Sequence, residues 1–210
     1  MNTSLLPVII LLFTLLHIRA EYRGPRWQIY LFKPLTTLFI LFLAIFAVQP
    51  VSPRYQWFIG LGLIFSLGGD IFLMLPKDRF IAGLVSFLAA HVCYIAAFSQ
   101  GIHVVSTPWV LLPFLLTVII FVGILWPHLA KMKLPVLIYA LAIGMMGWSA
   151  TERWLQIGEV KAFLAFGGAL LFIVSDAVLA YNRFVKRFTA AQAIILITYY
   201  IAQYLIASSV

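Results

Sequence analysis

Two carboxylates, Asp70 and Asp176, lie inside long apolar stretches of this chain. A charged side chain within a membrane span is costly and usually faces the protein interior, so each one indicates a functional site. Asp70 precedes Pro76 and Asp176 precedes Arg183 by similar intervals, which places the two acids at similar depth if their segments run in the same direction. Such a pair can supply a general acid and a general base. A structural hydrogen bond between helices is the alternative for each.

Further polar side chains lie in the apolar segments. His91 and Tyr94 are one helical turn apart and share a face, so they could orient one carboxylate. Satisfied core packing explains a lone histidine equally well. A later segment carries Tyr199, Tyr200 and Gln203, which we expect to support the site. Packing with some hydrogen bonding is the alternative for these three.

Lys33 and Arg183 are the basic residues that we expect to bind a phosphate group, with Lys33-Pro34 opening the second apolar segment. Ordinary loop cations would give the same pattern. The only cysteine, Cys93, excludes a cysteine-based metal cluster. The sequence also lacks the G-x-S-x-G, H-E-x-x-H, G-x-G-x-x-G and P-loop motifs. We therefore expect neither a metal nor another cofactor.

The elements that must position these groups are membrane spans, each of which needs about 20 mostly apolar residues. Segments of that kind occur at 4–19, 34–51, 55–75, 80–98, 108–126, 134–151, 160–181 and 188–207. The connections between them are short. The sequence therefore predicts an all-α, polytopic membrane protein, a bundle of about eight transmembrane helices forming one domain over 1–210. Gly69-Asp70 and Ser175-Asp176, each followed by Arg-Phe, indicate a possible weak four-plus-four repeat.

Composition supports the bilayer as solvent. The chain is 64% hydrophobic and 10% charged, whereas soluble domains are about 45–50% apolar and about 25% charged. The formal charge of +8 is spread over short connections, which argues against a nucleic-acid partner. The first apolar segment lacks a basic start and a clear small-residue cleavage site, so we expect a retained span and not a signal peptide.

The basic residues also predict the topology. Most of them fall in alternate connections, which the positive-inside rule places in the cytoplasm: Arg19, Arg23, Arg26, Lys33, Lys77, Arg79, Lys131, Lys133, Arg183, Lys186 and Arg187. Both termini are then expected outside. We expect the chain in a bacterial inner membrane, with the two acids toward the cytoplasmic side.

Several blocks of the chain, in order, resemble the YhhN-like, or lysoplasmalogenase, family: Lys33-Pro34-Leu35, the run 69–75, Ala90-His91-Val92-Cys93-Tyr94, Ser175-Asp176 and the run 198–203. The resemblance extends over nearly the whole chain. It implies an eight-helix membrane hydrolase that cleaves the vinyl ether of lysoplasmalogens to a fatty aldehyde and a glycerophospho-alcohol. The implied partners are a lysophospholipid substrate and membrane lipids.

The implied chemistry suits two carboxyl groups. A vinyl ether hydrolyses by protonation of its β-carbon, and water then captures the resulting oxocarbenium ion. Glycosidases handle a related cation with two carboxyl groups in different protonation states. Our hypothesis is that Asp70 and Asp176 form this pair, with His91 and Tyr94 orienting one of them; the sequence does not assign acid and base. The rival interpretation is a proton-coupled transporter or lipid-binding protein that uses the same acids as a relay.

Overall fold

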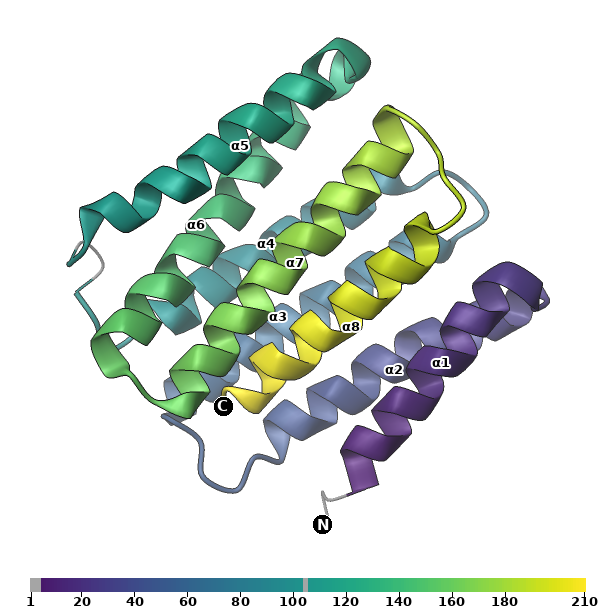
Figure 1. Cartoon of the computed structure of the whole chain (residues 1–210). Coiled ribbons are helices and arrows are strands. Elements are labelled where there is room, and N and C mark those ends of the chain that lie inside the picture. Colours follow the sequence, from purple (N-terminus) through teal and green to yellow (C-terminus); the bar gives the residue numbers. More distant parts are fainter. Residues whose placement is uncertain (1–4, 104–105) are drawn as a thin grey trace.

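The computed structural model describes residues 5–103 and 106–210, and this part of the chain forms eight α-helices and no strand. The helices lie side by side in one bundle (Figure 1). Their bounds are α1 Leu6–Arg23, α2 Arg26–Ile45, α3 Pro53–Met74, α4 Phe80–Phe98, α5 Leu111–Leu125, α6 Lys133–Ile157, α7 Val160–Phe184 and α8 Ala191–Ser208. The predicted all-helical fold is confirmed.

Most helix limits lie within a few residues of those predicted, but α2 does not begin at Pro34. It begins at Arg26 and contains Pro34 in its interior. A proline inside a helix removes one N–H from the hydrogen-bond ladder and its ring crowds the carbonyl one turn earlier, but membrane helices tolerate this because neighbouring groups satisfy the freed backbone atoms. The prediction that Lys33-Pro34 opens this helix is therefore wrong. Lys33 instead lies two turns inside α2, where its side chain can reach the interior.

Helix α6 extends past the predicted limit of 151 to Ile157. Its last turns contain Glu152 and Arg153, which are polar but almost fully buried. Arg153 Nη1 donates to the Gln100 carbonyl at 2.7 Å, and Glu152 Oε1 accepts from the Thr107 amide at 2.9 Å. Because protein groups satisfy these charges, the helix continues beyond its apolar stretch.

The helices have the surface of a membrane protein. In the described residues, seven helices are long and apolar enough to cross a bilayer. Large aliphatic side chains cover the outside of the bundle, among them Val8, Leu112, Ile119 and Leu134, each more than half exposed. A water-soluble monomer rarely exposes so much contiguous apolar surface. The chain is therefore an integral membrane protein.

Helix α1 is not among these seven, although a span was predicted at 4–19. Its outward face is apolar, but its last turns carry Arg19, Glu21 and Arg23. These charges belong to the end of the bundle where the basic connections gather. The predicted first span thus forms a helix that packs on α2. This helix continues past the predicted limit of residue 19 into a charged end.

The two halves of the chain pack in the same order. Helix α3 packs most extensively on α4 and α7 on α8, while α2 contacts α3 and α8, and α6 contacts α7 and α4. The α1–α2, α2–α3 and α3–α4 contacts have counterparts four helices later in α5–α6, α6–α7 and α7–α8. This order supports the four-plus-four relation that the two Asp segments indicated.

Small residues bring the central helices close together. A Cβ on Gly62 of α3 would lie 2.2 Å from the Tyr94 ring of α4, and one on Gly168 of α7 would lie 2.9 Å from the Ala202 carbonyl of α8. The small residues on one face of each Asp-bearing helix thus admit a neighbouring helix. Close approach of this kind is usual where transmembrane helices associate.

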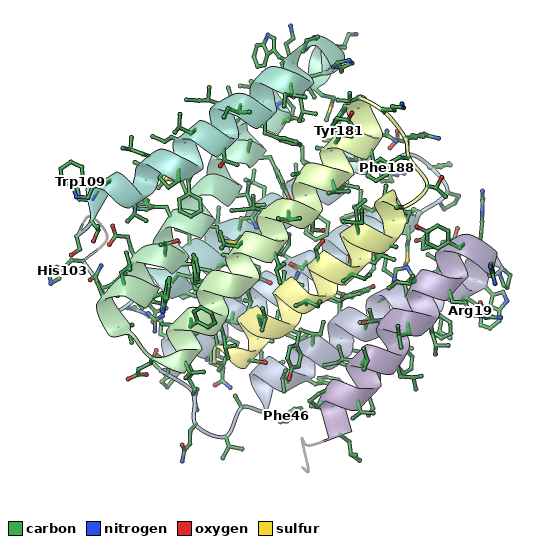
Figure 2. All side chains as sticks on the ribbon, viewed as in Figure 1. Arg19, Phe46, His103, Trp109, Tyr181 and Phe188 are labelled. Carbon is green, nitrogen blue, oxygen red and sulfur yellow. The ribbon has the colours of Figure 1, made fainter. Side chains whose placement is uncertain are left out.

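The ends of the bundle differ in character. Residues Arg19, Tyr181 and Phe188 lie at one end, whereas Phe46, His103 and Trp109 lie at the other (Figure 2). The described parts of the chain near both termini lie at the second end (Figure 1). Arg19 and Phe188 mark the end at which the α1–α2, α3–α4 and α7–α8 connections meet.

Candidate active site

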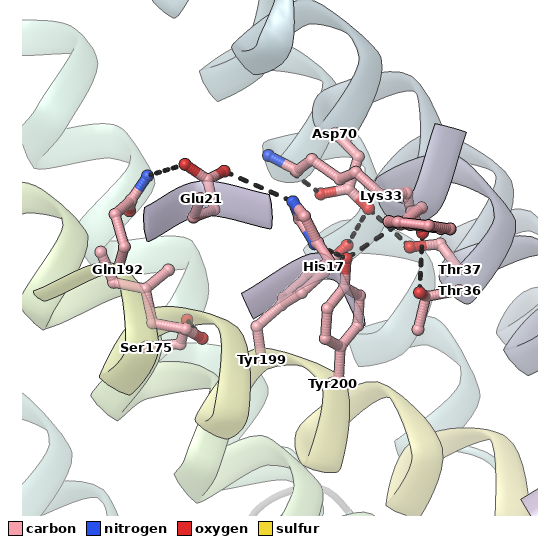
Figure 3. A network of polar contacts seen from close by, with 12 residues as sticks. His17, Glu21, Lys33, Thr36, Thr37, Asp70, Ser175, Gln192, Tyr199 and Tyr200 are labelled. Atoms are coloured by element: carbon pink, nitrogen blue, oxygen red, sulfur yellow. Dashed lines mark hydrogen bonds and ion pairs between the residues drawn. The ribbon is translucent and has the colours of Figure 1, made fainter. Parts of the chain in front are cut away.

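Asp70 is buried and is bound by groups from two other helices. Thr37 Oγ1 of α2 donates to Asp70 Oδ2 at 2.6 Å, and the Tyr199 hydroxyl of α8 donates to the same oxygen at 2.7 Å. Lys33 Nζ lies 3.7 Å from the other oxygen, Oδ1. Lys33 and Thr37 are one turn apart and therefore share a face of α2. Three polar hydrogen donors thus surround this carboxyl group (Figure 3).

Asp176 has a separate set of partners. The Tyr139 hydroxyl of α6 donates to Asp176 Oδ2. His91 Nε2 of α4 lies 3.4 Å from the same oxygen and 3.0 Å from the Tyr139 hydroxyl. The side chain of Asp176 is 13% exposed, whereas that of Asp70 is 2% exposed. The two acids therefore differ in both partners and accessibility.

The arrangement around the two acids follows the internal order of the bundle. Each carboxylate accepts a hydrogen bond from a hydroxyl group on the preceding helix of the chain: Thr37 donates to Asp70, and Tyr139 donates to Asp176. Each also meets an aromatic side chain from the last helix of the other half, Tyr199 or His91. The two sites are thus related by the same four-helix shift as the packing.

A single aromatic ring, Phe172, holds the partner side chains in place. It lies on α7 one turn before Asp176 and is fully buried. Its ring centroid lies 4.9 Å from that of His91 and 5.5 Å from that of Tyr199, both edge to face. Packing of this kind restricts the rotamers of the side chains that orient the two carboxyl groups.

Both acids line one cavity of about 620 Å³, here called the polar cavity. It lies at the end of the bundle where the α1–α2, α3–α4 and α7–α8 connections meet. Five basic residues also line it: Arg26, Lys33, Arg79, Arg183 and Arg187. Glu21 and Asp78 line it too, so the cavity joins the two acids of the membrane spans to a cluster of charges of both signs.

Arg183 lines the polar cavity but touches neither Asp70 nor Asp176 in the described structure. Its guanidinium forms an ion pair with Asp78 and lies 5.1 Å over the Phe80 ring. This hydrogen bond from Arg183 holds the pKa of the exposed Asp78 carboxyl below its usual range. Arg183 is thus a cation at the rim of the cavity, already paired with a surface carboxylate.

Three residues expected to orient an acid or to support the site contact neither Asp70 nor Asp176 in the described structure. The Tyr94 hydroxyl donates to Gln203 Oε1 at 2.8 Å and lies 3.4 Å from Ser66 Oγ, so Tyr94 and Gln203 join α3, α4 and α8 and contact no carboxylate. Tyr94 does not orient an acid by direct contact, because its ring covers Gly62 deeper in the bundle.

Tyr200 belongs to a second buried network (Figure 3). Its hydroxyl lies 2.7 Å from His17 Nδ1, while His17 Nε2 lies 3.3 Å from Glu21 Oε1. Glu21 also accepts from Gln192 Nε2 at 3.3 Å. The network holds α1 against α8 beside the Asp70 site. The Tyr200 hydroxyl also lies near the backbone carbonyl of Lys33. Tyr200 therefore contacts the helix that carries Lys33 and does not contact Asp70 or Asp176.

Sequence reasoning missed Thr37, Tyr139, His17 and Glu21. Thr37 follows Lys33 by one turn, and His17 and Glu21 form an i, i+4 pair, so helical spacing could have drawn attention to them. Tyr139 had no such signal, because it is one aromatic residue in an apolar helix. In residues 5–103 and 106–210, no three His, Cys, Asp or Glu side chains gather closely enough to hold a metal ion.

The sequence of this chain is similar to those of known membrane proteins. A profile described as the YhhN family matches residues 28–210. The uncharacterized membrane protein YhhN of Escherichia coli O157:H7 is 33% identical over 196 residues, covering 92% of each chain. Lysoplasmalogenase TMEM86A of Bos taurus is 34% identical over 197 residues, covering 89% of this chain and 79% of its own. The human TMEM86A is 32% identical over 203 residues, with the same coverage of both chains. No solved structure gives a significant match. The extent of these matches shows that this chain belongs to the YhhN family.

Proposed function

We propose that this protein is a membrane-embedded hydrolase that cleaves the vinyl ether bond of lysoplasmalogens. The observation that carries the proposal is the polar cavity, which both Asp70 and Asp176 line together with five basic residues. Relatives that share about a third of its residues bear the name lysoplasmalogenase.

The chemistry needs one carboxyl group to give a proton and another to help water. Protonation of the β-carbon leaves an oxocarbenium ion, and water adds to the α-carbon, which is bonded to the ether oxygen. The hemiacetal then breaks down to a fatty aldehyde and a glycerophospho-alcohol. General acid–base catalysis of this kind contributes about 10²- to 10⁴-fold. Asp70 and Asp176 are the acidic side chains of the polar cavity that lie within membrane-spanning helices.

The basic residues would hold the phosphate of the substrate. Lys33 lines the polar cavity beside Asp70, and Arg183 lies at its rim. A lysophospholipid has one hydrocarbon chain and one phosphate, so its reactive bond lies only a few atoms from the phosphate. We propose that Lys33 and Arg183 bind the phosphate while the vinyl ether reaches the carboxyl groups.

We also propose that the polar cavity faces the cytoplasm of a bacterial inner membrane. The basic connections gather at that end of the bundle, as the positive-inside rule expects of cytoplasmic loops. A proton-coupled carrier is less well supported, because carrier sites are typically formed by discontinuous helices. Helices α3 and α7 are continuous through both acids.

The test is aldehyde release by the purified protein in detergent or liposomes. A 1-alkenyl lysophosphatidylethanolamine should yield one fatty aldehyde for each glycerophosphoethanolamine, whereas the matched 1-alkyl ether should remain intact. Failure to release aldehyde from 1-alkenyl lysophospholipids with either ethanolamine or choline headgroups would contradict the proposal. Cleavage of the alkyl ether would contradict the vinyl ether mechanism, because that bond cannot form the cation by carbon protonation.

A further inference from the structure

A second cavity adjoins the polar one and is almost wholly apolar. It has a volume of about 120 Å³ and lies among α4, α5, α6 and α7; we call it the apolar cavity. Its walls consist of aliphatic and aromatic side chains such as Phe114, Val118 and Ile173. The lining residues with polar side chains are Thr117, Tyr139 and Asp176. A site with this lining suits a hydrocarbon.

The two cavities meet at Asp176. Five residues line both of them: Leu73, Phe80, Phe87, Asp176 and Leu179. Asp70, in contrast, lines only the polar cavity and not the apolar one. A molecule with a charged head and an apolar chain could therefore occupy both spaces at once, with the junction of its two parts beside Asp176.

Small residues make room for the apolar cavity. Ala140 and Gly144 line it from α6, while Ala177 and Ala180 line it from α7. A Cβ on Gly144 would lie 2.9 Å from Val118 Cγ2 of α5, so even one added carbon would press on the opposite wall. The space between α5 and α6 thus depends on the absence of a side chain at this position.

From this juxtaposition we propose that the apolar cavity binds the first part of the substrate's hydrocarbon chain. The inference rests on the proposed function for the identity of the head, which the polar cavity would hold. A cavity of about 150 Å³ can hold benzene, so this one accommodates a segment of roughly five carbon atoms. Helix α5 packs on α6 and barely touches α7, which lets the rest of a longer chain continue between α5 and α7 into the bilayer.

This binding mode assigns the roles of the two acids. The β-carbon of the vinyl ether lies on the chain side, toward Asp176, and the ether oxygen lies on the head side. Asp176 gives its proton to the β-carbon, the double-bond electrons form the new C–H bond, and the α-carbon becomes an oxocarbenium centre. Water forms a C–O bond there and passes its proton to Asp70. As the hemiacetal breaks down, Asp70 returns that proton to the departing alcohol oxygen and Asp176 takes the hydroxyl proton, which restores both groups.

Photolabelling locates the chain without requiring turnover. The probe is a 1-O-alkyl lysophosphatidylethanolamine with a diazirine about five carbons from the ether oxygen, and mass spectrometry identifies the labelled residues. We expect labels on the apolar-cavity faces of α5, α6 and α7, and a loss of most of this label in Gly144→Leu. Gly123→Leu is the matched control, because Gly123 lies on α5 with open space around it. Undiminished labelling in a folded Gly144→Leu variant would overturn the proposal.

Kinetics supply the second readout. Discrimination by one methylene in an apolar pocket is worth about 10- to 200-fold, so Gly144→Leu should lower kcat/KM for an alkenyl substrate by at least about tenfold. Gly123→Leu should not change it. If Gly144→Leu does not fold, Ala180→Leu on the α7 wall replaces it with the same expected results. A folded cavity-filling variant with unchanged kcat/KM would overturn the chain site.

The two proposals fail in different ways. A wild-type protein that releases no aldehyde but shows labelling sensitive to Gly144→Leu would refute the hydrolase and retain the chain site. Aldehyde release together with labelling confined to the lipid-facing surface would do the reverse. For the roles of the acids, azide should capture the cation in Asp70→Asn and give an α-azido ether, while Asp176→Asn should give none. The opposite pattern would overturn the assignment.

Discussion

Removal of the hydroxyl group of Tyr199 tests whether the partners of Asp70 matter to the reaction. The Tyr199 hydroxyl and Thr37 Oγ1 donate to the same carboxyl oxygen, at 2.7 Å and 2.6 Å. A hydrogen bond to a charged group is worth about 1.5–3 kcal/mol. Since about 1.36 kcal/mol corresponds to tenfold in rate, Tyr199→Phe should lower kcat/KM by about 10- to 150-fold.

Substitution of Thr37, the second donor to Asp70 Oδ2, extends the test to a double-mutant cycle. Thr37→Val should lower kcat/KM by a similar factor, because it removes the other hydroxyl from Asp70 Oδ2. With one hydroxyl gone, the other still holds the carboxyl group, so the double variant should lose more than the two single losses combined. Coupling between groups in one network is about 0.5–3 kcal/mol. The assay is initial-rate aldehyde release by all four proteins, with thermal unfolding in detergent as the measure of folding.

Tyr204→Phe is the matched control for this cycle. Tyr204 lies on the same helix, is partly buried and lines neither cavity. Its replacement should leave kcat/KM unchanged. A folded Tyr199→Phe protein with wild-type kcat/KM would refute the reasoning that the hydrogen bonds from Tyr199 and Thr37 orient Asp70 for catalysis. Strict additivity of the two substitutions would refute the idea that they share one oriented oxygen.

Three further predictions concern other parts of the structure. His91→Gln should lower kcat by about 10-fold or more while changing KM little, because His91 contacts Asp176 but does not line the polar cavity; a raised KM with unchanged kcat would contradict this. Gly168→Ala should destabilise the protein by about 1–3 kcal/mol in denaturation experiments, since its Cβ would lie 2.9 Å from a backbone carbonyl, whereas Gly123→Ala in open space should not; equal stability of the two variants would count against the α7–α8 packing. In intact bacterial cells carrying Cys93→Ser, an impermeant maleimide should label Val48→Cys and not Lys186→Cys; the reverse would invert the proposed topology.

The helices were predictable from the sequence because membrane spans depend on long apolar runs, which need no knowledge of tertiary contacts. The predicted helix limits were wrong where a proline lies inside a helix or where a charged side chain has a buried partner. Pro34 was taken as a helix start, but it lies inside α2. Arg153 was taken as lying beyond the end of its span, but it is buried within α6 with a carbonyl partner. In both cases packing against other helices decided the outcome.

The candidate site was only partly predictable. The cost of placing charge in a membrane identified Asp70 and Asp176, and the structure places both on one cavity with Lys33 and Arg183. The partners that orient the acids come from helices distant in sequence, such as Tyr139 of α6 and Thr37 of α2. One sequence carries no direct record of which helices meet. For that reason Tyr94 was placed beside an acid that it does not contact.

The most direct test of the central claim, that the two acids inside the membrane spans carry out vinyl ether hydrolysis, is aldehyde release by Asp70→Asn and Asp176→Asn in parallel with the wild type. Glu159→Gln is the control, because Glu159 is an exposed carboxylate at the start of α7, away from both cavities. We predict that each Asp variant folds but loses at least about 10²-fold in kcat, the lower end of what acid–base catalysis contributes. We predict no change for Glu159→Gln. Wild-type rates in either folded Asp variant would contradict the account.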